Sequence, residues 1–128
     1  MRPETPNFDG RALIGGQRVA ARDGQTFDCI SPVDGRVLAQ VARCGAADID
    51  AAVQACRRVG NHDITLLKCT SSYRAPVEEA NLLTIPNMRQ TFGVQVGLSD
   101  HTLGEAVAMA AAALGARVIE KHFILDRT

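Results

Sequence analysis

The chain has 128 residues, 46% of them hydrophobic, and its 14 Lys and Arg residues balance 14 Asp and Glu residues. This length excludes a complete (β/α)8 barrel, which needs about 250 residues. Zero net charge argues against a nucleic-acid binder or a polybasic membrane binder, and 4% aromatic residues make base-stacking surfaces improbable. The longest apolar run, residues 106–116, is too short to span a bilayer.

The first half has the pattern of antiparallel strands. Short strands are predicted at 12–14 and 17–20 around Gly15-Gly16, then at 26–30 and 36–42 around the turn Ser31-Pro32-Val33-Asp34-Gly35. A helix is predicted from Ala46 to about Arg58, with an apolar stripe at i, i+3, i+4 and i+7. This half therefore predicts hairpins followed by one helix.

The second half has the pattern of parallel βαβ units. Strands are predicted at 64–68, 94–98 and 117–120, separated by a helix that Thr84 caps and a helix from about Leu103 to Leu114. Polar segments directly follow each strand. In parallel α/β folds the sites are built at that carboxyl-terminal edge of the sheet.

His101 and His122 are the strongest candidates for chemistry, because each follows one of two consecutive predicted strands. If these strands are neighbours, both imidazoles reach one rim and suit a divalent first-row metal. The alternative is two unrelated loop histidines.

Other polar residues lie at equivalent strand ends. Glu120 and Asp100 flank the histidines and could orient a ligand or move a proton, although Asp100 also fits a simple turn. Thr70, Ser71 and Ser99 offer hydroxyls for a phosphate or carboxylate, although such residues fill turns everywhere. Lys68 could pair with an anion or merely extend its ammonium into water.

Several common catalytic arrangements are absent from the sequence. It contains no G-x-G-x-x-G, no P-loop and no G-x-S-x-G, so no NAD site is expected. Its four cysteines form no C-x-x-C pair, which favours reduced thiols and a cytoplasmic location. The absence of a hydrophobic leader at residues 1–10 also predicts no signal peptide and no membrane association.

Residues from about 61 to 128 resemble the sialic-acid synthase family, most closely its pseudaminic-acid branch. The resemblance is carried by Leu66-Leu67-Lys68-Cys69-Thr70-Ser71-Ser72-Tyr73, Val96-Gly97-Leu98-Ser99-Asp100-His101-Thr102 and Val118-Ile119-Glu120-Lys121-His122-Phe123. One departure is Arg74, where the family usually has proline.

That resemblance implies condensation of phosphoenolpyruvate with an open-chain N-acetylated sugar, on a (β/α)8 barrel with a divalent metal, Mn or Mg. It implies that His101 and His122 are the metal ligands and that Glu120 is the catalytic carboxylate. It also implies that the substrates are bound by Thr70, Ser71, Tyr73 and Ser99.

Residues from about 8 to 58 resemble the amino-terminal segment of aldehyde dehydrogenases. The matching runs are Leu13-Ile14-Gly15-Gly16-Gln17, Ser31-Pro32-Val33-Asp34-Gly35 and Val37-Leu38-Ala39-Gln40-Val41-Ala42. The catalytic cysteine, glutamate base and cofactor-binding lysine of that family lie beyond this segment, so its oxidoreductase chemistry is not expected here.

Together these observations predict a chimera-like α/β chain. Residues 1–59 form an antiparallel hairpin region plus a helix, and residues 60–128 form the last three βα units of a TIM barrel. The expected function is that of a fragment of a phosphoenolpyruvate-dependent nonulosonic acid synthase, weakly active or inactive alone. The alternatives are a non-catalytic fusion fragment or a remnant of an NAD(P)-dependent aldehyde dehydrogenase. Open sheet edges of a partial barrel further predict self-association.

Overall fold

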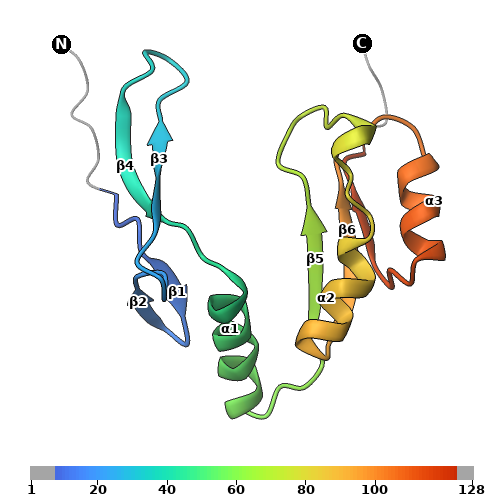
Figure 1. Ribbon diagram of the computed structural model, residues 1–128, viewed down its shortest axis with the longest axis horizontal. Helices are drawn as coiled ribbons and strands as arrows, with labels where there is room; N and C mark the ends of the chain where they lie inside the picture. Colours follow the sequence, from blue (N-terminus) through green and yellow to red (C-terminus); the bar gives the residue numbers. More distant parts are fainter. Residues whose placement is uncertain (1–7, 124–128) are drawn as a thin grey trace. The chain divides into compact units, whose positions relative to one another are not determined.

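A computed structural model of the chain describes residues 8–123 and divides the protein into two compact units. The first unit is Met1–His62 and the second is Asp63–Thr128 (Figure 1). None of the helices in the described part of the chain is long and apolar enough to cross a membrane.

The first unit contains two antiparallel strand pairs. Strands β1 (Ala12–Ile14) and β2 (Gln17–Val19) pair across Gly15 and Gly16, which have φ angles of 58° and 78°. Strands β3 (Thr26–Ile30) and β4 (Val37–Ala42) form the second pair. Side chains with a Cβ rarely adopt positive φ angles, so the two glycines permit the tight first turn. The predicted strands and their turns are confirmed.

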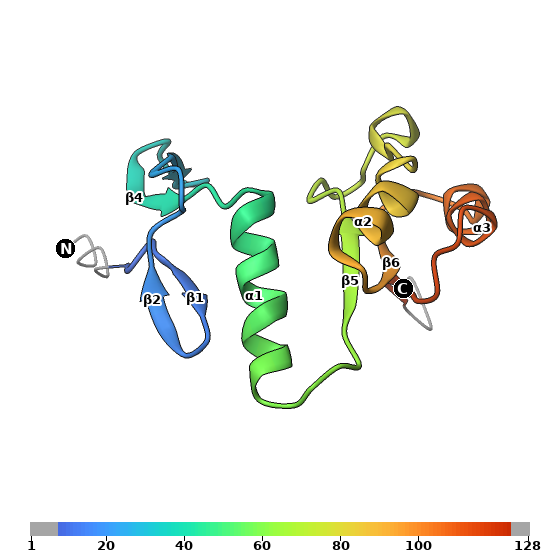
Figure 2. The same cartoon turned by 60° about the horizontal axis from the view of Figure 1, so that its bottom comes forward.

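Helix α1 (Ala46–Arg58) follows the two strand pairs (Figure 2), and Asp48 caps its first turn. The Asp48 carboxylate accepts hydrogen bonds from the backbone N–H groups of Gly45 at 2.9 Å and Arg22 at 3.0 Å. The side chain is buried, and its negative charge lies in the first turn, where the helix dipole favours it. Asp48 therefore joins the start of α1 to the segment that follows β2.

Substituting Asp48 by alanine is expected to destabilise the start of α1 by about 1–2 kcal/mol, because two backbone donors lose their acceptor. Amide hydrogen exchange across α1 measures this cost. Asp50→Ala is the matched control, since Asp50 is exposed and only accepts a hydrogen bond from Gln54. Equal exchange in the two variants would contradict the assignment of the cap to Asp48.

The second unit is built around a three-stranded parallel sheet in the order β5-β6-β7. Its strands are β5 (Thr65–Cys69), β6 (Gln95–Asp100) and β7 (Ile119–Lys121). The connections carry the short 3-10 helix Val77–Glu79, α2 (Thr84–Phe92) and α3 (Ala106–Ala113). The predicted β-α-β-α-β order and the α/β class are confirmed.

Helices α2 and α3 pack on the same face of β6. Val96 and Leu98 on this face form a buried core with Ile85 of α2 and with Val107 and Ala111 of α3. Ser99 and Gly97 alternate with these residues and belong to the other face of β6. The helix-bearing face of β6 therefore carries the core of the second unit, and Gly97 and Ser99 lie on its other face.

Several boundaries differ from the sequence prediction. Helix α3 begins at Ala106 rather than about Leu103, because Gly104 has a φ of 74°, which is incompatible with a right-handed helix. Strand β6 continues through Ser99 and Asp100, which were expected in a loop. Thr84 is the first residue of α2, and no side chain caps that helix.

Candidate functional site

Three aromatic rings meet beyond the carboxyl-terminal ends of the sheet. His101 follows β6 and His122 follows β7, and their ring centroids are 5.1 Å apart. The Tyr73 ring, from the loop after β5, lies 4.5 Å from His101 and 5.2 Å from His122. The register of β6 and β7 explains the histidine pair, because Ser99 opposes Glu120 and Asp100 opposes Lys121. The predicted convergence of the two imidazoles is confirmed.

The loop after β5 fixes the orientation of His101. His101 Nδ1 lies 3.0 Å from the carbonyl oxygen of Thr70, and the Ala75 N–H donates a hydrogen bond to the His101 carbonyl at 3.0 Å. A carbonyl oxygen only accepts, so Nδ1 carries the proton in this contact. In the neutral ring the lone pair is then on Nε2, where a metal or a substrate proton can be bound.

Glu120 is held by its neighbour across the sheet. The Ser99 hydroxyl donates a hydrogen bond to Glu120 Oε1 at 2.7 Å, on the face of the sheet opposite the helices. Ser99 is buried, whereas Glu120 is exposed. The structure thus joins two of the predicted site residues into one pair and leaves the carboxylate accessible.

A cavity of about 360 Å³ adjoins the aromatic cluster. It is lined by Tyr73, Arg74, Asp100, His101, Thr102, Leu103, Gly104, Lys121 and His122. Of the residues that the sequence offered as candidates, Tyr73, Asp100, His101 and His122 line it.

Thr70 and Ser71 lie outside this lining. The Thr70 hydroxyl accepts a hydrogen bond from Lys68 Nζ at 2.5 Å and contacts the Glu79 carbonyl at 3.3 Å. The Ser71 hydroxyl lies 3.9 Å from Cys69 Sγ. The Thr70 hydroxyl is therefore engaged within the protein, while its carbonyl orients His101.

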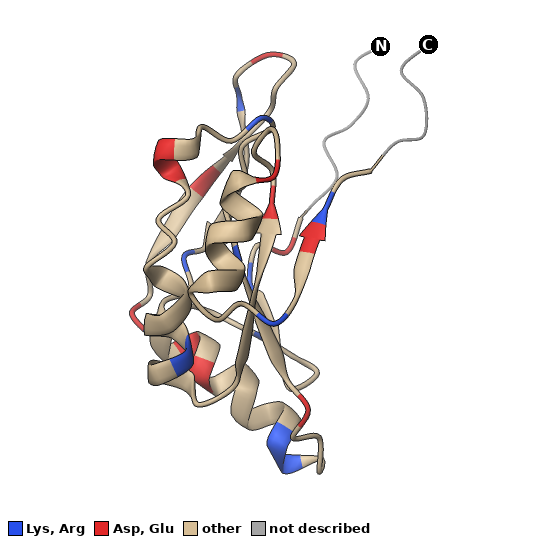
Figure 3. Cartoon of the chain, turned by 90° about the vertical axis from the view of Figure 1, so that its right-hand side faces the viewer, with Lys and Arg blue, Asp and Glu red and all other residues tan. Residues whose placement is uncertain are grey.

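Asp100 and Lys121 form a buried contact that the sequence did not single out. Lys121 Nζ donates to Asp100 Oδ2 and to the Thr102 carbonyl, both at 2.7 Å, while Asp100 Oδ1 accepts from the Thr102 N–H and hydroxyl. Burial raises the pKa of Asp100, but the hydrogen bonds from Lys121 and Thr102 outweigh it and keep this pKa below its usual value. On β7 itself an acidic and a basic position follow one another, Glu120 and Lys121 (Figure 3).

A lowered pKa in the folded state makes Asp100 a source of stability at neutral pH. This contribution is complete above the unfolded-state pKa of about 3.9 and is lost as the pH falls through the folded-state value. We expect the difference in stability between the wild type and Asp100→Asn to shrink as the pH is lowered through that range. Amide exchange of Val96 and Leu98 at several pH values measures it, and a pH-independent difference would contradict this prediction.

The separation of the two histidine rings fits that of two ligands bound to one metal ion. A metal–nitrogen bond of roughly 2.1 Å places two coordinating rings roughly 4.5–5.5 Å apart, centre to centre, and the observed separation is 5.1 Å. Within residues 8–123 no group of three or more His, Cys, Asp and Glu side chains is arranged to hold a metal.

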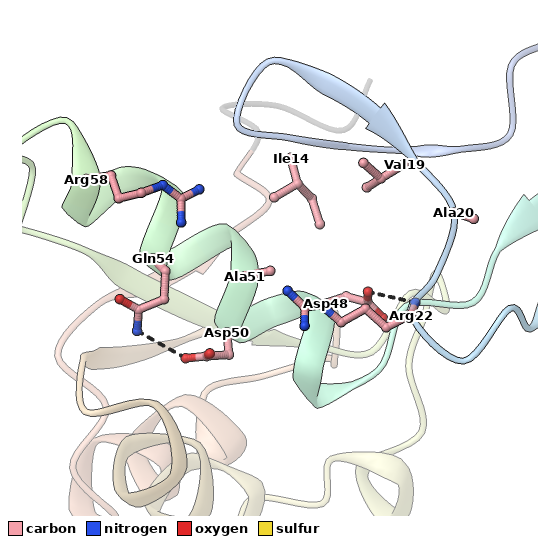
Figure 4. Close-up of a pocket in the computed structure, with 9 residues that line it drawn as sticks. All are labelled: Ile14, Val19, Ala20, Arg22, Asp48, Asp50, Ala51, Gln54 and Arg58. Carbon is pink, nitrogen blue, oxygen red and sulfur yellow. Dashed lines mark hydrogen bonds between the residues drawn. The ribbon is translucent and has the colours of Figure 1, made fainter.

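A second cavity, of about 390 Å³, lies between β2 and α1 in the first unit (Figure 4). Both carboxylates in its lining already accept hydrogen bonds within the protein. Asp48 accepts from backbone N–H groups, and Asp50 accepts from Gln54 at 3.3 Å. Its lining contains no histidine or cysteine. We therefore place the candidate site on the cavity beside His101 and His122.

Comparison with known proteins shows the family of the chain. The family model of the NeuB family matches residues 30–128, more than half of the chain. The chain belongs to the NeuB family. The match begins at residue 30, within the segment that was expected to resemble aldehyde dehydrogenases, and the comparisons do not show that resemblance.

Individual members of the NeuB family are similar to the chain over part of their length. Pseudaminic acid synthase of Helicobacter pylori is 51% identical over 81 residues, which are 63% of this chain and 24% of that protein. N,N'-diacetyllegionaminic acid synthase of Campylobacter jejuni is 38% identical over 100 residues, which are 77% of this chain and 30% of that protein.

A solved NeuB-type structure is also similar. The spore coat polysaccharide biosynthesis protein spsE of Bacillus subtilis superposes with a TM-score of 0.61 at 38% identity. The match covers 67% of this chain and 25% of that chain. The chain thus spans about a quarter of the length of the proteins that it resembles.

Proposed function

We propose that this chain carries the metal-binding edge of a synthase that condenses phosphoenolpyruvate with an N-acetylated sugar to a nonulosonic acid. The observation that carries the proposal is the convergence of His101, His122 and Tyr73 at the ends of β5, β6 and β7. The printed names of the relatives, pseudaminic and legionaminic acid synthases, support this substrate class.

His101 and His122 would hold a divalent ion, Mn or Mg, through their free ring nitrogens. The ion, when bound, would polarise the sugar aldehyde as a Lewis acid. The hydrogen bond from His101 Nδ1 to the Thr70 carbonyl fixes the ring orientation and leaves Nε2 as the nitrogen that would bind the ion. Tyr73, 73% exposed and beside both imidazoles, would contact the substrate at the same edge.

Glu120 is the proposed catalytic carboxylate, because it is exposed and is oriented by Ser99. Its second oxygen is available to accept a proton or to bind a substrate hydroxyl. Ser99 would contribute to substrate binding mainly by orienting Glu120. Thr70 and Ser71 would contact the substrate from their positions in the loop after β5.

The three strands are a minority of an eight-stranded barrel, so we propose that the chain alone has little or no activity. The unit supplies one edge of the site, whereas five strands would supply the rest. Pairing of β5 or β7 with strands of another copy remains a prediction for the same reason.

Transfer of the segment into a full-length relative tests the proposal. Residues 63–128 would replace the matching region of the Helicobacter pylori pseudaminic acid synthase, and phosphate release from phosphoenolpyruvate would be measured with the N-acetylated sugar and Mn²⁺. We expect a folded hybrid with sugar-dependent phosphate release that His101→Ala reduces at least about 100-fold. A folded hybrid without such release, or an unaffected His101→Ala hybrid, would show that these residues do not serve this reaction.

For residues 1–59 we propose an aldehyde-dehydrogenase-like origin without oxidoreductase activity. The support is the run of sequence noted above and the two antiparallel strand pairs followed by a helix. Cys29, Cys44, Cys56 and Cys69 are free thiols, which supports a reducing, cytoplasmic location.

A further inference from the structure

The last two strands of the sheet end at an ion pair, and the two histidines follow it directly. Asp100 and Lys121 are register partners at the ends of β6 and β7. His101 and His122 are the next residues of each chain segment. Whatever fixes the spacing of β6 and β7 at this position therefore also fixes the spacing of the imidazoles.

The contact between Asp100 and Lys121 is well suited to fix that spacing. The Asp100 side chain is only 1% exposed and the Lys121 side chain 33%, and their charged atoms are 2.7 Å apart. Low exposure limits screening by salt and competition from water. The hydrogen-bonded ammonium also binds the Thr102 carbonyl, so the pair holds β7 against both the end and the following loop of β6.

The carboxylate completes this network on its other oxygen. Asp100 Oδ1 accepts from the Thr102 N–H at 2.9 Å and from its hydroxyl at 2.7 Å. Removal of Lys121 would leave a buried carboxylate without its counter-ion, which is a costly arrangement. The ends of the two strands would then separate or rotate to admit water.

The cross-strand contact on the opposite face does not replace this pair. Ser99 and Glu120 are joined one position earlier by a single hydrogen bond. Glu120 is exposed, so water competes with that bond. The contact on the helix-bearing face differs in two ways: its carboxylate, Asp100, is only 1% exposed, and the Lys121 ammonium donates two hydrogen bonds across the strands.

We propose that Asp100 and Lys121 are positioning residues that hold His101 and His122 at a separation suited to a single bound cation. The expected effect on metal binding rests on the proposed function. The expected effect on the spacing of the imidazoles does not, because the ion pair acts in the metal-free protein too. Neither residue contacts the ion. They act through the strand ends that carry its ligands.

The test compares the full chain with Lys121→Met and Asp100→Asn, and Arg117→Met is the matched control. Arg117 is exposed and lies just before β7, so its substitution removes the same charge without touching the pair. The first measurement is the nuclear Overhauser effect between the ring protons of His101 and His122 in metal-free protein. The second is the dissociation constant for Mn²⁺ alone, measured by calorimetry.

We expect Lys121→Met and Asp100→Asn to lose the ring-to-ring effect and to bind Mn²⁺ about 10- to 100-fold more weakly, as substitutions around metal ligands do. Arg117→Met should match the wild type in both measurements. Lys121→Arg, which can still donate to the Asp100 carboxylate and the Thr102 carbonyl, should recover part of both signals. Retained amide shifts at Val96 and Leu98 would show that the core is intact.

Persistence of the ring-to-ring effect in folded Lys121→Met, or its equal loss in Arg117→Met, would overturn the inference. If Lys121→Met fails to fold, the double variant Asp100→Asn with Lys121→Met removes the buried charge and answers the same question. If the wild type and His101→Ala bind Mn²⁺ equally, the proposed metal site fails. The ring-to-ring measurement then still decides the positioning role, because it needs no metal.

Discussion

Substituting His101 or His122 by alanine is expected to weaken strongly the Mn²⁺ binding that we propose for the chain. Each variant leaves one imidazole, and within residues 8–123 no third His, Cys, Asp or Glu side chain is arranged to complete a site. A single neutral imidazole with water ligands binds divalent ions poorly, so we expect the affinity to fall by about 100-fold or more. The two single variants and the double variant should therefore be equally deficient.

Isothermal calorimetry with Mn²⁺ at neutral pH measures this effect. His62→Ala is the matched control, because His62 is exposed and belongs to the first unit. Identical binding isotherms for the wild type and His101→Ala would refute the assignment of the ligands.

Substituting Gly97 by alanine is expected to disrupt both the sheet and the site. A Cβ at this position would lie 2.4 Å from the carbonyl oxygen of Val118 and 2.7 Å from Cδ2 of Leu67. The carbonyl belongs to the backbone just before β7, so β7 must move to relieve the clash. Overpacking of this kind costs about 1–3 kcal/mol or more. The same movement would displace His122 relative to His101.

Urea unfolding followed by far-UV circular dichroism gives the loss of stability, and Mn²⁺ calorimetry gives the loss of the site. The double variant Gly97→Ala with Leu67→Ala separates the two clashes. It removes the contact with the Leu67 side chain but not the contact with the Val118 carbonyl, so it should recover only part of the stability. Full recovery would show that β7 is not constrained by the close approach at Gly97.

The secondary structure was largely predictable because its signals are local. Gly15-Gly16 and the turn at 31–35 mark hairpins through their backbone preferences. The three later strands and two helices follow from apolar runs and periodicity. The start of α3 was misplaced because Gly104 adopts a positive φ, which residue identity permits but does not require.

The site was predictable only in part, because pairing across a sheet depends on register. His101 and His122 could be brought together from their positions after consecutive strands, and the structure does so. The ion pair of Asp100 and Lys121 was missed because a lysine at a strand end usually extends into water. Only the register that places it opposite Asp100 reveals its partner. The engaged hydroxyl of Thr70 likewise depends on Lys68 reaching it on the helix-bearing face.

The parallel arrangement of β6 and β7 has a consequence for the order of folding. Asp100 and Lys121 are 21 residues apart, and one helix connects their strands. Because the two strands are close in sequence, bringing their ends and the two imidazoles together has a low entropic cost. A cation that bridges the two rings would therefore favour this single β-α-β segment over the unfolded chain, and metal binding and folding of the segment would be thermodynamically linked.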